Sequence, residues 1–372
     1  MESEPDAAPK NDALVRVAFV YAGGRLGRGA QGPSDFFYGA RELQNRPGWD
    51  VRLVDADAKP ADVPTGFFAG RLAKRFLPPR TSADWIARSR RLLPQLRGCD
   101  VVVATTTELS FGLALWKAWG FLPQPLLGIL CGAVNYPIGS ELRRRWTAKL
   151  LSKMQPVLFA DPEKAELLQR FGPRDIAVGW FGVDENFWTP PAPPAARRGV
   201  LAVGNDGRRD YATLIEAARA MTQESFTVVT RMEPPAALPA NVAWRRGDWR
   251  RQAVSDEELR ELYRSAACVV VPLLESPQPS GQSVAMQAIM CGAPVVHTRT
   301  AGWWGAEVIR EGEHIVLVEP CSPSSLEEGI GKALSVGMAR NNARSALLSA
   351  QWTTKGFAER ISEIVEHSSA PS

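Results

Sequence analysis

The side chains best placed for chemistry stand in a loop that opens directly into a helix, within residues 275–300. Two prolines and Gly281 exclude regular structure in the loop, and the Ser-Gly-Gln-Ser run at 280–283 leads into a short apolar helical pattern. A helix that starts in this way presents unpaired backbone N–H groups and the positive end of its dipole at one point. The pattern therefore predicts a phosphate site, where glycine lets the anion approach the backbone.

A second group that suits a phosphate follows the strand predicted at 200–203. There the sequence GNDGRRD makes a glycine turn and places Arg208 and Arg209 at the start of the next helix. A guanidinium group supplies several N–H donors in a planar fork that matches phosphate oxygens. We expect Arg209 and the backbone amides of residues 280–283 to converge on one diphosphate, and Arg208 to face solvent.

Two further patterns could bind a cofactor or a metal. The glycine-rich run GGRLGRG follows the first predicted strand, but its spacing differs from the GxGxxG fingerprint, so a nicotinamide site is a weak alternative. Asp55 and Asp57 follow the second strand, and such a pair could hold a divalent ion that binds a diphosphate. Carboxylates are also common at this point of Rossmann-like units for other reasons. We expect no metal site.

Length and composition restrict the classes of protein. A chain of 372 residues exceeds one ordinary core and predicts two α/β domains. The 45% hydrophobic and 23% charged residues are typical of a soluble globular protein, and a net charge of +4 is too small to indicate a nucleic-acid partner. The five cysteines are dispersed without CxxC or metal-ligand spacing, which favours reduced thiols and predicts no zinc site.

We expect neither export nor a membrane-spanning segment. Residues 1–13 are polar and acidic, without the apolar stretch of a signal peptide. The most apolar later segment, 111–138, is interrupted by Lys117 and by glycines and prolines, which leave pieces too short to span a bilayer. The sequence therefore favours a cytoplasmic protein.

Apolar runs of strand length alternate with helical patterns along the chain, as in parallel sheets. The strands of the first half are predicted at 15–22, 51–54, 99–104, 126–131, 157–160 and 176–180. Those of the second half are predicted at 200–203, 226–230, 242–244, 268–273, 293–297 and 315–318. The helices predicted between the strands include 35–45, with Ser34-Asp35 as a good N-cap pair, 256–265 and 307–310. Each half of the chain thus reads as one Rossmann-like unit.

Residues 67–97 form a basic and aromatic segment. Basic side chains at 71, 74, 75, 80, 88, 90, 91 and 97 face the single acid Asp84. One interpretation is a pair of solvated surface helices, and the other is docking to an anionic membrane face. A second basic helix is predicted around 143–153. A nucleic-acid partner is not expected, because the chain lacks a recognisable motif for base contacts.

The run SGQSVAMQAIMCGAPVV at 280–296 resembles the signature of family-four retaining glycosyltransferases, which hold a sugar nucleotide in the C-terminal domain of a two-domain GT-B architecture. The resemblance implies two Rossmann-like domains facing across a cleft, with the C-terminal helix crossing back to the first domain. We place the domains at 14–189 and 200–351, with a Pro-rich linker at 190–199. Residues 352–368 would pack back on the first domain.

The resemblance also implies which residues hold the nucleotide sugar, with no further cofactor and no metal. Arg209 would bind the leaving-group diphosphate. The other residues expected to bind the sugar donor are Asn205, Arg208, Glu275, Ser280, Gly281, Gln282, Ser283 and Gln287. Gly29 and Gly32 are matched to the loop that covers the diphosphate and borders the acceptor.

This chain departs from the family pattern at three points. Family members have two glutamates where Pro279 and Gln287 stand, and Glu275 is nearby but out of register. Members also carry a histidine in the first domain, whereas the three histidines here all lie in the second half. We expect Gln287 to hold the ribose of the sugar donor. We assign no general base, because the departing diphosphate is thought to take the acceptor proton in this family.

The function implied by this resemblance is metal-independent transfer of a sugar, with retention, from a nucleoside-diphosphate sugar. The acceptor would be a polysaccharide, a lipid-linked molecule or another carbohydrate. The expected location is the cytoplasm, with peripheral contact at the inner face of the cell membrane. Two alternatives stay open: a GT-B protein that binds but has lost catalysis, and a nucleotide-sugar epimerase of the same architecture.

Overall fold

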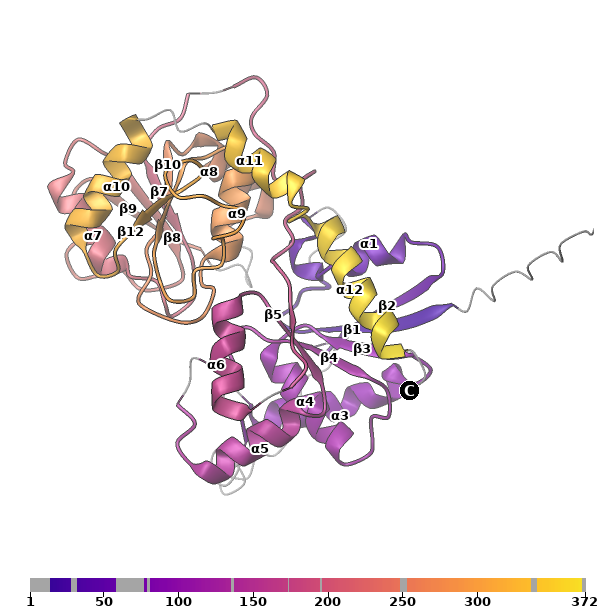
Figure 1. The fold of residues 1–372 in the computed structure, drawn as a ribbon. Coiled ribbons are helices and arrows are strands. Elements are labelled where there is room, and N and C mark those ends of the chain that lie inside the picture. Colours follow the sequence, from indigo (N-terminus) through magenta and orange to yellow (C-terminus); the bar gives the residue numbers. More distant parts are fainter. Residues whose placement is uncertain are drawn as a thin grey trace, which may run out of the picture.

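The computed structural model describes residues 14–27, 32–57, 77–78, 81–134, 137–172, 174–194, 196–247, 253–335 and 340–369. Within these residues the strands form two six-stranded parallel sheets, one in each half of the chain. Figure 1 shows the result as two lobes, each with helices packed around its own sheet. The predicted two-domain α/β fold is therefore confirmed.

The first sheet has the strand order β2-β1-β3-β4-β5-β6. Its strands are β1 (Val15–Tyr21), β2 (Trp49–Asp55), β3 (Val101–Ala104), β4 (Leu126–Ile129), β5 (Gln155–Leu158) and β6 (Ala177–Val178). β3 is apolar at every position and fully buried, since helices cover both faces of a parallel sheet. This sheet and its helices form the N-terminal domain.

The N-terminal domain contains both α-helices and short 3-10 helices. They are η1 (Asp35–Phe37), α1 (Ala40–Gln44), α3 (Ala83–Leu92), η2 (Leu93–Leu96), α4 (Thr107–Ala118), α5 (Glu141–Leu151) and α6 (Asp161–Phe171). Ser82, Thr106 and Ser140 cap α3, α4 and α5, because each hydroxyl accepts a bond from a backbone N–H of the first turn.

The second sheet has the order β12-β11-β10-β7-β8-β9 and belongs to the C-terminal domain. Its strands are β7 (Val200–Val203), β8 (Phe226–Thr230), β9 (Val242–Arg246), β10 (Cys268–Val271), β11 (Val295–Thr298) and β12 (Val316–Val318). Its helices are α7 (Tyr211–Ala220), α8 (Asp256–Ser265), α9 (Gln282–Met290), α10 (Pro323–Ser335) and α11 (Arg340–Ser349). The order matches that expected for a second Rossmann-like unit.

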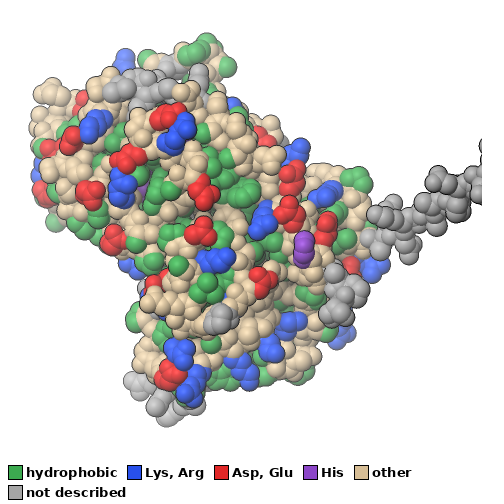
Figure 2. Space-filling model, viewed as in Figure 1, with side chains coloured by type: hydrophobic (Ala, Val, Ile, Leu, Met, Phe, Trp, Pro, Cys, Tyr) green, Lys and Arg blue, Asp and Glu red, His purple; other side chains and the backbone are tan. Residues whose placement is uncertain are grey.

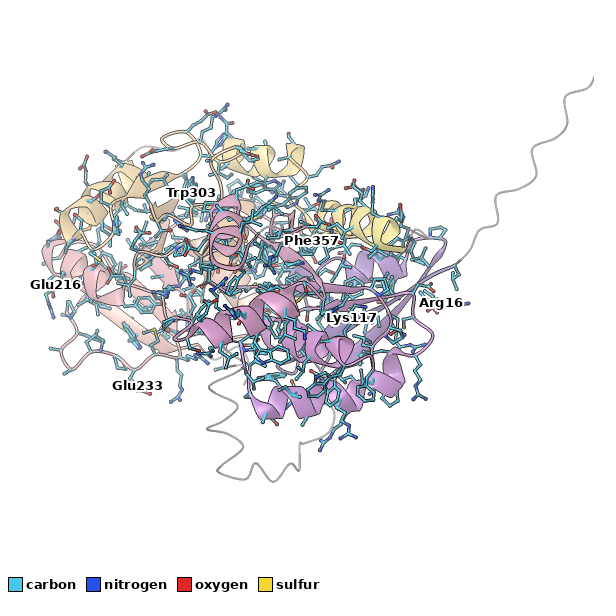
Figure 3. The ribbon with its side chains drawn as sticks, turned by 60° about the horizontal axis from the view of Figure 1, so that its bottom comes forward. Arg16, Lys117, Glu216, Glu233, Trp303 and Phe357 are labelled. Atoms are coloured by element: carbon cyan, nitrogen blue, oxygen red, sulfur yellow. The ribbon has the colours of Figure 1, made fainter. Side chains whose placement is uncertain are left out.

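The last helix, α12 (Thr354–Ser369), returns to the N-terminal domain and lies beside α1 (Figure 1). Phe357 stacks on Phe159 with ring centroids 6.1 Å apart, and Figure 3 labels Phe357 where α12 meets the N-terminal lobe. A Cβ on Gly39 would stand 2.6 Å from Ala358 Cα, so the two helices meet at backbone distance. The predicted return of the C-terminal helix is confirmed.

Three local predictions were wrong or missing. The helix predicted at 35–45 is broken, because Tyr38 and Gly39 adopt left-handed backbone conformations with φ of 51° and 79°. The short helix predicted at 307–310 is a turn. α11 was not predicted at all. Boundaries elsewhere agree to within a few residues, and β7, β8 and α8 match their predicted bounds.

In the part of the chain that the structure describes, no helix combines the length and apolar character needed to cross a membrane. All five cysteines lie in described segments and none forms a disulfide. Cys99, Cys268 and Cys291 are buried, whereas Cys321 is exposed and Cys131 is half-buried.

Candidate active site

Three cavities follow one another from the junction of the two domains into the N-terminal domain. A cavity of about 280 Å³ lies between Arg25 and Phe36 of the N-terminal domain and Arg209, Tyr263 and Gln287 of the C-terminal domain. Because its wall comes from both domains, this space exists only when they face each other.

The middle cavity, of about 170 Å³, lies between the loop at 278–283 and the aromatic rings of Phe36, Tyr38, Phe159 and Phe181. It shares Phe36, Asp206 and Ser283 with the first cavity. The third cavity, of about 400 Å³, lies within the N-terminal domain and shares Tyr38 and Cys131 with the middle one. The shared residues order the three spaces from the C-terminal domain to the N-terminal domain.

Gly281 lets the loop at 278–283 turn sharply into α9. It has a φ of 77°, in the left-handed region that favours glycine. An added Cβ would stand 2.3 Å from Val271 Cγ1 and 3.0 Å from Arg209 Nη1, so no side chain fits. The backbone therefore approaches Arg209 at the N-terminus of α9, where the helix dipole is positive.

Gly204 and Asp206 lie against the side chain of Arg209 and hold it in place. Its side chain lies across Gly204, where an added Cβ would stand 1.9 Å from Arg209 Nε. The residue is 6% exposed, and Nη2 lies 3.4 Å from Asp206 Oδ2. Its Nε and Nη1 are buried and make no hydrogen bond within the described residues. Burying a guanidinium group with two unpaired N–H donors costs free energy unless an acceptor binds them.

Further buried polar atoms around the start of α9 also lack a partner among the described residues. They are Ser280 Oγ, Gln282 Nε2 and His297 Nε2. The Ser280 hydroxyl, the Gln282 amide and the Arg209 guanidinium are all hydrogen-bond donors. The donors, the cation and the helix N-terminus together make a site suited to a phosphate.

His297 was not predicted at the site. It lies beneath Gly281, because an added Cβ there would stand 3.2 Å from His297 Nε2. Burial lowers the pKa of His297 to about 4, so the ring is neutral at pH 7. Nδ1 donates to the carbonyl oxygen of Thr298 at 2.8 Å, which leaves Nε2 as an acceptor.

Two of the predicted site residues, Asn205 and Glu275, bond to the backbone of neighbouring turns. Asn205 donates to the Gly247 carbonyl at 2.7 Å and accepts from Arg231 N at 2.6 Å, while its side chain also lines the first cavity. Glu275 accepts from Ala301 N at 2.7 Å. Arg208 is half-buried and lines none of the three cavities.

Gln287 is 4% exposed and lines the first cavity, as expected of a residue that faces the sugar nucleotide. Its amide is not free, however. Nε2 donates to Asp35 Oδ2 of the N-terminal domain at 2.7 Å, and Oε1 has a long contact of 3.5 Å from the Tyr263 hydroxyl. The side chain predicted to hold the ribose thus already contacts a residue of the other domain.

Asp35 was interpreted from the sequence as a helix cap, but its carboxylate points into the domain junction. It is 1% exposed and accepts three hydrogen bonds: Asp184 N to Oδ1 at 2.6 Å, and Trp188 Nε1 and Gln287 Nε2 to Oδ2 at 2.7 Å each. Burial raises the pKa of Asp35 to about 7, and these bonds oppose the rise. A sequence pattern gives no sign of a bond between residues so far apart.

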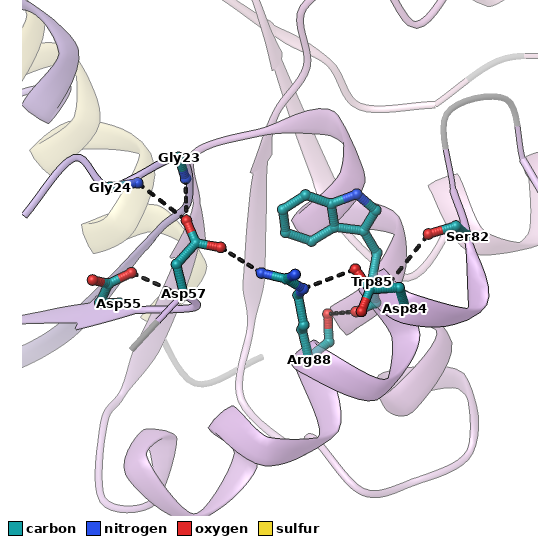
Figure 4. A network of polar contacts seen from close by, with 9 residues as sticks. Gly23, Gly24, Asp55, Asp57, Ser82, Asp84, Trp85 and Arg88 are labelled. Carbon is teal, nitrogen blue, oxygen red and sulfur yellow. Dashed lines mark hydrogen bonds and ion pairs between the residues drawn. The ribbon is translucent and has the colours of Figure 1, made fainter. Parts of the chain in front are cut away.

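In the N-terminal domain, Asp57 joins the loop after β1 to α3 (Figure 4). Its carboxylate accepts from Gly23 N and, at 3.1 Å, from Gly24 N. It also pairs with Arg88 Nη1 at 2.6 Å. Asp55 Oδ1 accepts from Asp57 N at 2.8 Å. The two carboxylates are thus engaged in the protein's own contacts.

This arrangement bears on the metal site that the Asp55–Asp57 pair could have formed. Among the described residues no group of three or more His, Cys, Asp and Glu side chains could hold a metal ion. In the loop after β1, Gly23 lines the third cavity. Gly32 accepts from Arg41 Nη1 through its carbonyl at 2.9 Å, and Gly29 lies outside the described residues.

The structure describes only part of the basic segment at 67–97. Residues 67–76 lie outside the described residues, whereas Trp85 and Arg88 of α3 line the third cavity. The aromatic side chains of Trp119 and Phe121, beyond the end of α4, are 54% and 62% exposed. Figure 2 shows that basic side chains predominate over the lower part of the N-terminal domain, where α3 and α5 lie.

Residues 197–336 match the family described as glycosyl transferases group 1. This match covers most of the C-terminal domain. A D-inositol 3-phosphate glycosyltransferase from Acidothermus cellulolyticus is 34% identical over 91 residues, which are 24% of this chain. The matched part spans 19% of the length of that relative.

Solved structures match nearly the whole chain at low identity. Sucrose-phosphate synthase from Thermosynechococcus elongatus is similar with a TM-score of 0.66 and 17% identity, covering 95% of this chain and 98% of that one. The Anabaena protein HepE, solved in complex with UDP-glucose, is similar with a TM-score of 0.67 and 14% identity, covering 95% and 99%. These similarities identify the fold as GT-B, and together with the family match they support a transferase activity.

Proposed function

We propose that this protein transfers a sugar from a nucleoside-diphosphate sugar to a carbohydrate or lipid-linked acceptor, with retention of configuration and without a metal ion. The first cavity takes the nucleoside, the start of α9 takes the diphosphate, and the middle cavity takes the sugar. The third cavity takes the acceptor. This assignment follows the order in which the three cavities share their walls.

The observation that carries the proposal is the set of buried, unpartnered donors around the start of α9. Arg209 Nε and Nη1, Ser280 Oγ and Gln282 Nε2 have no partner among the described residues, and Gly281 brings the backbone close to Arg209 Nη1. A diphosphate supplies acceptors for all of them and complements both the guanidinium and the helix dipole. The UDP-glucose complex of the similar HepE structure supports this choice of ligand class.

The chemistry of this site rests on the leaving group. As the bond between the sugar and the diphosphate breaks, negative charge grows on the phosphate oxygen. Arg209 and the α9 amides stabilise that charge more strongly in the transition state than in the ground state. Metal independence follows from the same residues, which supply the positive charge that an ion would otherwise provide.

Retention is proposed because residues 280–296 resemble retaining glycosyltransferases, in which the leaving group itself takes the acceptor proton. Asp57 lines the third cavity, but its carboxylate already accepts from two backbone amides and Arg88. The sugar donor's own phosphate oxygen would then take the acceptor proton on the face that the diphosphate leaves. This route needs no carboxylate on the opposite face of the sugar.

We also propose that the N-terminal domain docks on an anionic membrane surface in the cytoplasm. Trp119 and Phe121 are exposed beyond α4, and Arg90 and Arg91 are exposed on the neighbouring α3. Aromatic rings suit the headgroup region, and each basic residue near an anionic surface contributes about 1 kcal/mol. Sedimentation with anionic vesicles should carry the protein down, and equal sedimentation with neutral vesicles would contradict this docking.

A protein that binds a nucleotide sugar without transferring it is the second candidate. The observation in its favour is Gln287, which stands where relatives have a glutamate and is engaged with Asp35. An epimerase of the same architecture would change the nucleotide sugar without any acceptor.

Incubation with UDP-, GDP- and ADP-sugars, in EDTA and with mixed carbohydrate acceptors, distinguishes the three functions by mass spectrometry. A transferase yields nucleoside diphosphate and a glycosylated acceptor, and an epimerase yields an isomeric nucleotide sugar. Binding to a nucleotide sugar that stays unchanged would identify the binding protein. Activity that disappears in EDTA and returns with Mn²⁺ would contradict the metal-independent mechanism.

A further inference from the structure

The contact between Asp35 and Gln287 joins the two domains behind the wall of the first cavity. Gln287 lines that cavity from α9, whereas Asp35 lies behind it, buried at the N-terminal end of η1. Trp188, from the segment that leads to the C-terminal domain, donates to the same carboxylate oxygen. This buried cluster connects an N-terminal carboxylate to the side chain expected to hold the ribose.

The other two partners of Asp35 decide how the Gln287 amide is turned. Asp184 N and Trp188 Nε1 can only donate hydrogen bonds. Oδ2 already accepts from Trp188, so in the ionised state of Asp35, above its pKa of about 7, a third partner at Oδ2 must also donate. Gln287 meets this condition only by presenting its NH₂ group to Asp35, which the 2.7 Å bond from Nε2 shows.

We infer that Asp35 is a positioning residue for the sugar-donor site, which turns the carbonyl oxygen of Gln287 toward the nucleotide ribose. This inference rests on the proposed function, since the cavity must hold a nucleoside. Oε1 then accepts a ribose hydroxyl, as one oxygen of a glutamate would. Glutamine lacks the negative charge that a glutamate would have at position 287. The Asp35 carboxylate supplies a negative charge from the opposite domain and does not contact the ligand.

The same geometry explains why glutamine stands at position 287. A glutamate there would place a second carboxylate against Asp35 Oδ2, and two such groups in contact cannot both be ionised at low cost. They would have to share one proton. Glutamate at position 287 is therefore expected to weaken nucleotide binding in this chain. It would strengthen binding if Asp35 played no part.

The charged and titratable groups around Asp35 are few. Asp184 faces it from the segment after β6 and raises its pKa further. Tyr263 of α8 is the other titratable neighbour, and burial keeps its hydroxyl protonated by raising its pKa. Neither group supplies a counter-charge, so the hydrogen bonds from Gln287, Trp188 and Asp184 N hold the carboxylate in place.

Calorimetric titration of Gln287→Glu with UDP, GDP and ADP tests this role at two pH values. At pH 8.5 the variant should bind the nucleotide preferred by the wild type about tenfold or more weakly, because the introduced carboxylate and that of Asp35 repel each other. At pH 6 the difference from the wild type should shrink. The introduced carboxyl group, once protonated, can then donate to Asp35 and keep its carbonyl oxygen toward the cavity.

Two further variants separate positioning from folding. Asp35→Asn combined with Gln287→Glu removes one of the two carboxylates and should recover nucleotide affinity at pH 8.5. The double variant should still unfold at a lower temperature, because a donor of the Asp35 cluster loses its acceptor. Gln95→Glu, on an exposed part of η2, adds the same charge elsewhere and should leave the affinity unchanged.

The outcomes distinguish this inference from the proposed function. If Gln287→Glu binds as well as or better than the wild type at pH 8.5, Asp35 does not orient residue 287. The same conclusion follows if the loss of affinity is equal at both pH values. If the wild type binds none of the three nucleotides, the proposed function itself is wrong.

Discussion

Arg208 and Arg209 are neighbours in sequence with different environments, and this difference can be measured. Arg209 is buried with two unpartnered N–H groups, whereas Arg208 is half-buried and lines none of the three cavities. Arg209→Ala should lower kcat by about 100-fold, the effect typical of losing one preorganised charge donor, with a smaller change in KM. Arg208→Ala should change kcat much less. Equal effects in steady-state kinetics would remove Arg209 from the leaving-group site.

The buried carboxyl group of Glu163 leads to a second prediction at the scale of single residues, which concerns the pH dependence of stability. It is fully buried on α6, and Oε1 accepts from Gly132 N at 3.0 Å while Oε2 has no partner in the described chain. Burial raises its pKa from 4.5 to about 8. A folded-state pKa above the unfolded value stabilises the protein fully below pH 4.5, and this contribution is lost as pH rises through about 8.

The wild-type stability should therefore fall between pH 5 and pH 8 with a contribution from Glu163 of up to about 1.4 kcal/mol per pH unit. Glu163→Gln keeps the shape of the side chain and removes the titration. Chemical denaturation at several pH values should show a flatter profile for this variant. Parallel profiles for the two proteins would mean that Glu163 titrates normally in the folded state.

How far the sequence predicts the site depends on how local each feature is. The glycine turn before α7 and the loop before α9 are local patterns, so the sequence alone points to Arg209 and residues 280–283. The structure brings Arg209 close to Gly281 in that loop. The bonds of Asp35 to Asp184, Trp188 and Gln287 join distant parts of the chain. Nothing in the residues around Asp35 distinguishes this carboxylate from a helix cap.

At the scale of elements, the junction between the loop at 278–283 and α9 is sensitive to a single methyl group. Gly281→Ala places a Cβ 2.3 Å from Val271 Cγ1 at a φ of 77°, so the loop must move or strain. We expect a loss of nucleotide affinity of at least tenfold and a lower Tm, with a cost of about 1–3 kcal/mol.

Gly207→Ala is the matched control for this change. Gly207 is exposed in the turn before α7, and an added Cβ there meets no atom within 4 Å. Its affinity and Tm should stay close to those of the wild type. If the two alanine variants bind nucleotide equally well, close backbone approach at Gly281 is not required.

The elements themselves were predicted best where their pattern is strongest. Buried strands of parallel sheets read as short apolar runs, so each predicted strand is present, with ends that differ by up to a few residues. The helix at 35–45 failed because the chain must turn at Tyr38 and Gly39 to pass α12, whose Ala358 lies against Gly39. That contact crosses more than three hundred residues and leaves no local signal.

At the scale of the whole molecule, the two domains build the candidate site together. The first cavity takes its wall from both domains, and Asp35 of one domain holds Gln287 of the other. α12 packs against α1 and ties the end of the chain to the N-terminal domain (Figure 1). If the first cavity takes a nucleotide as proposed, its binding is coupled to the relative position of the domains, because both domains line that cavity.

The central claim is that Arg209 and the start of α9 bind a diphosphate without a metal ion. The most direct measurement is calorimetric titration, in EDTA, of UDP, UMP and uridine, and of the GDP and ADP series, into the wild type and Arg209→Ala. The account predicts that one diphosphate binds the wild type at least tenfold more tightly than its monophosphate, and that Arg209→Ala removes this difference. Equal affinity for diphosphate and monophosphate, or a preference that survives in Arg209→Ala, would contradict it.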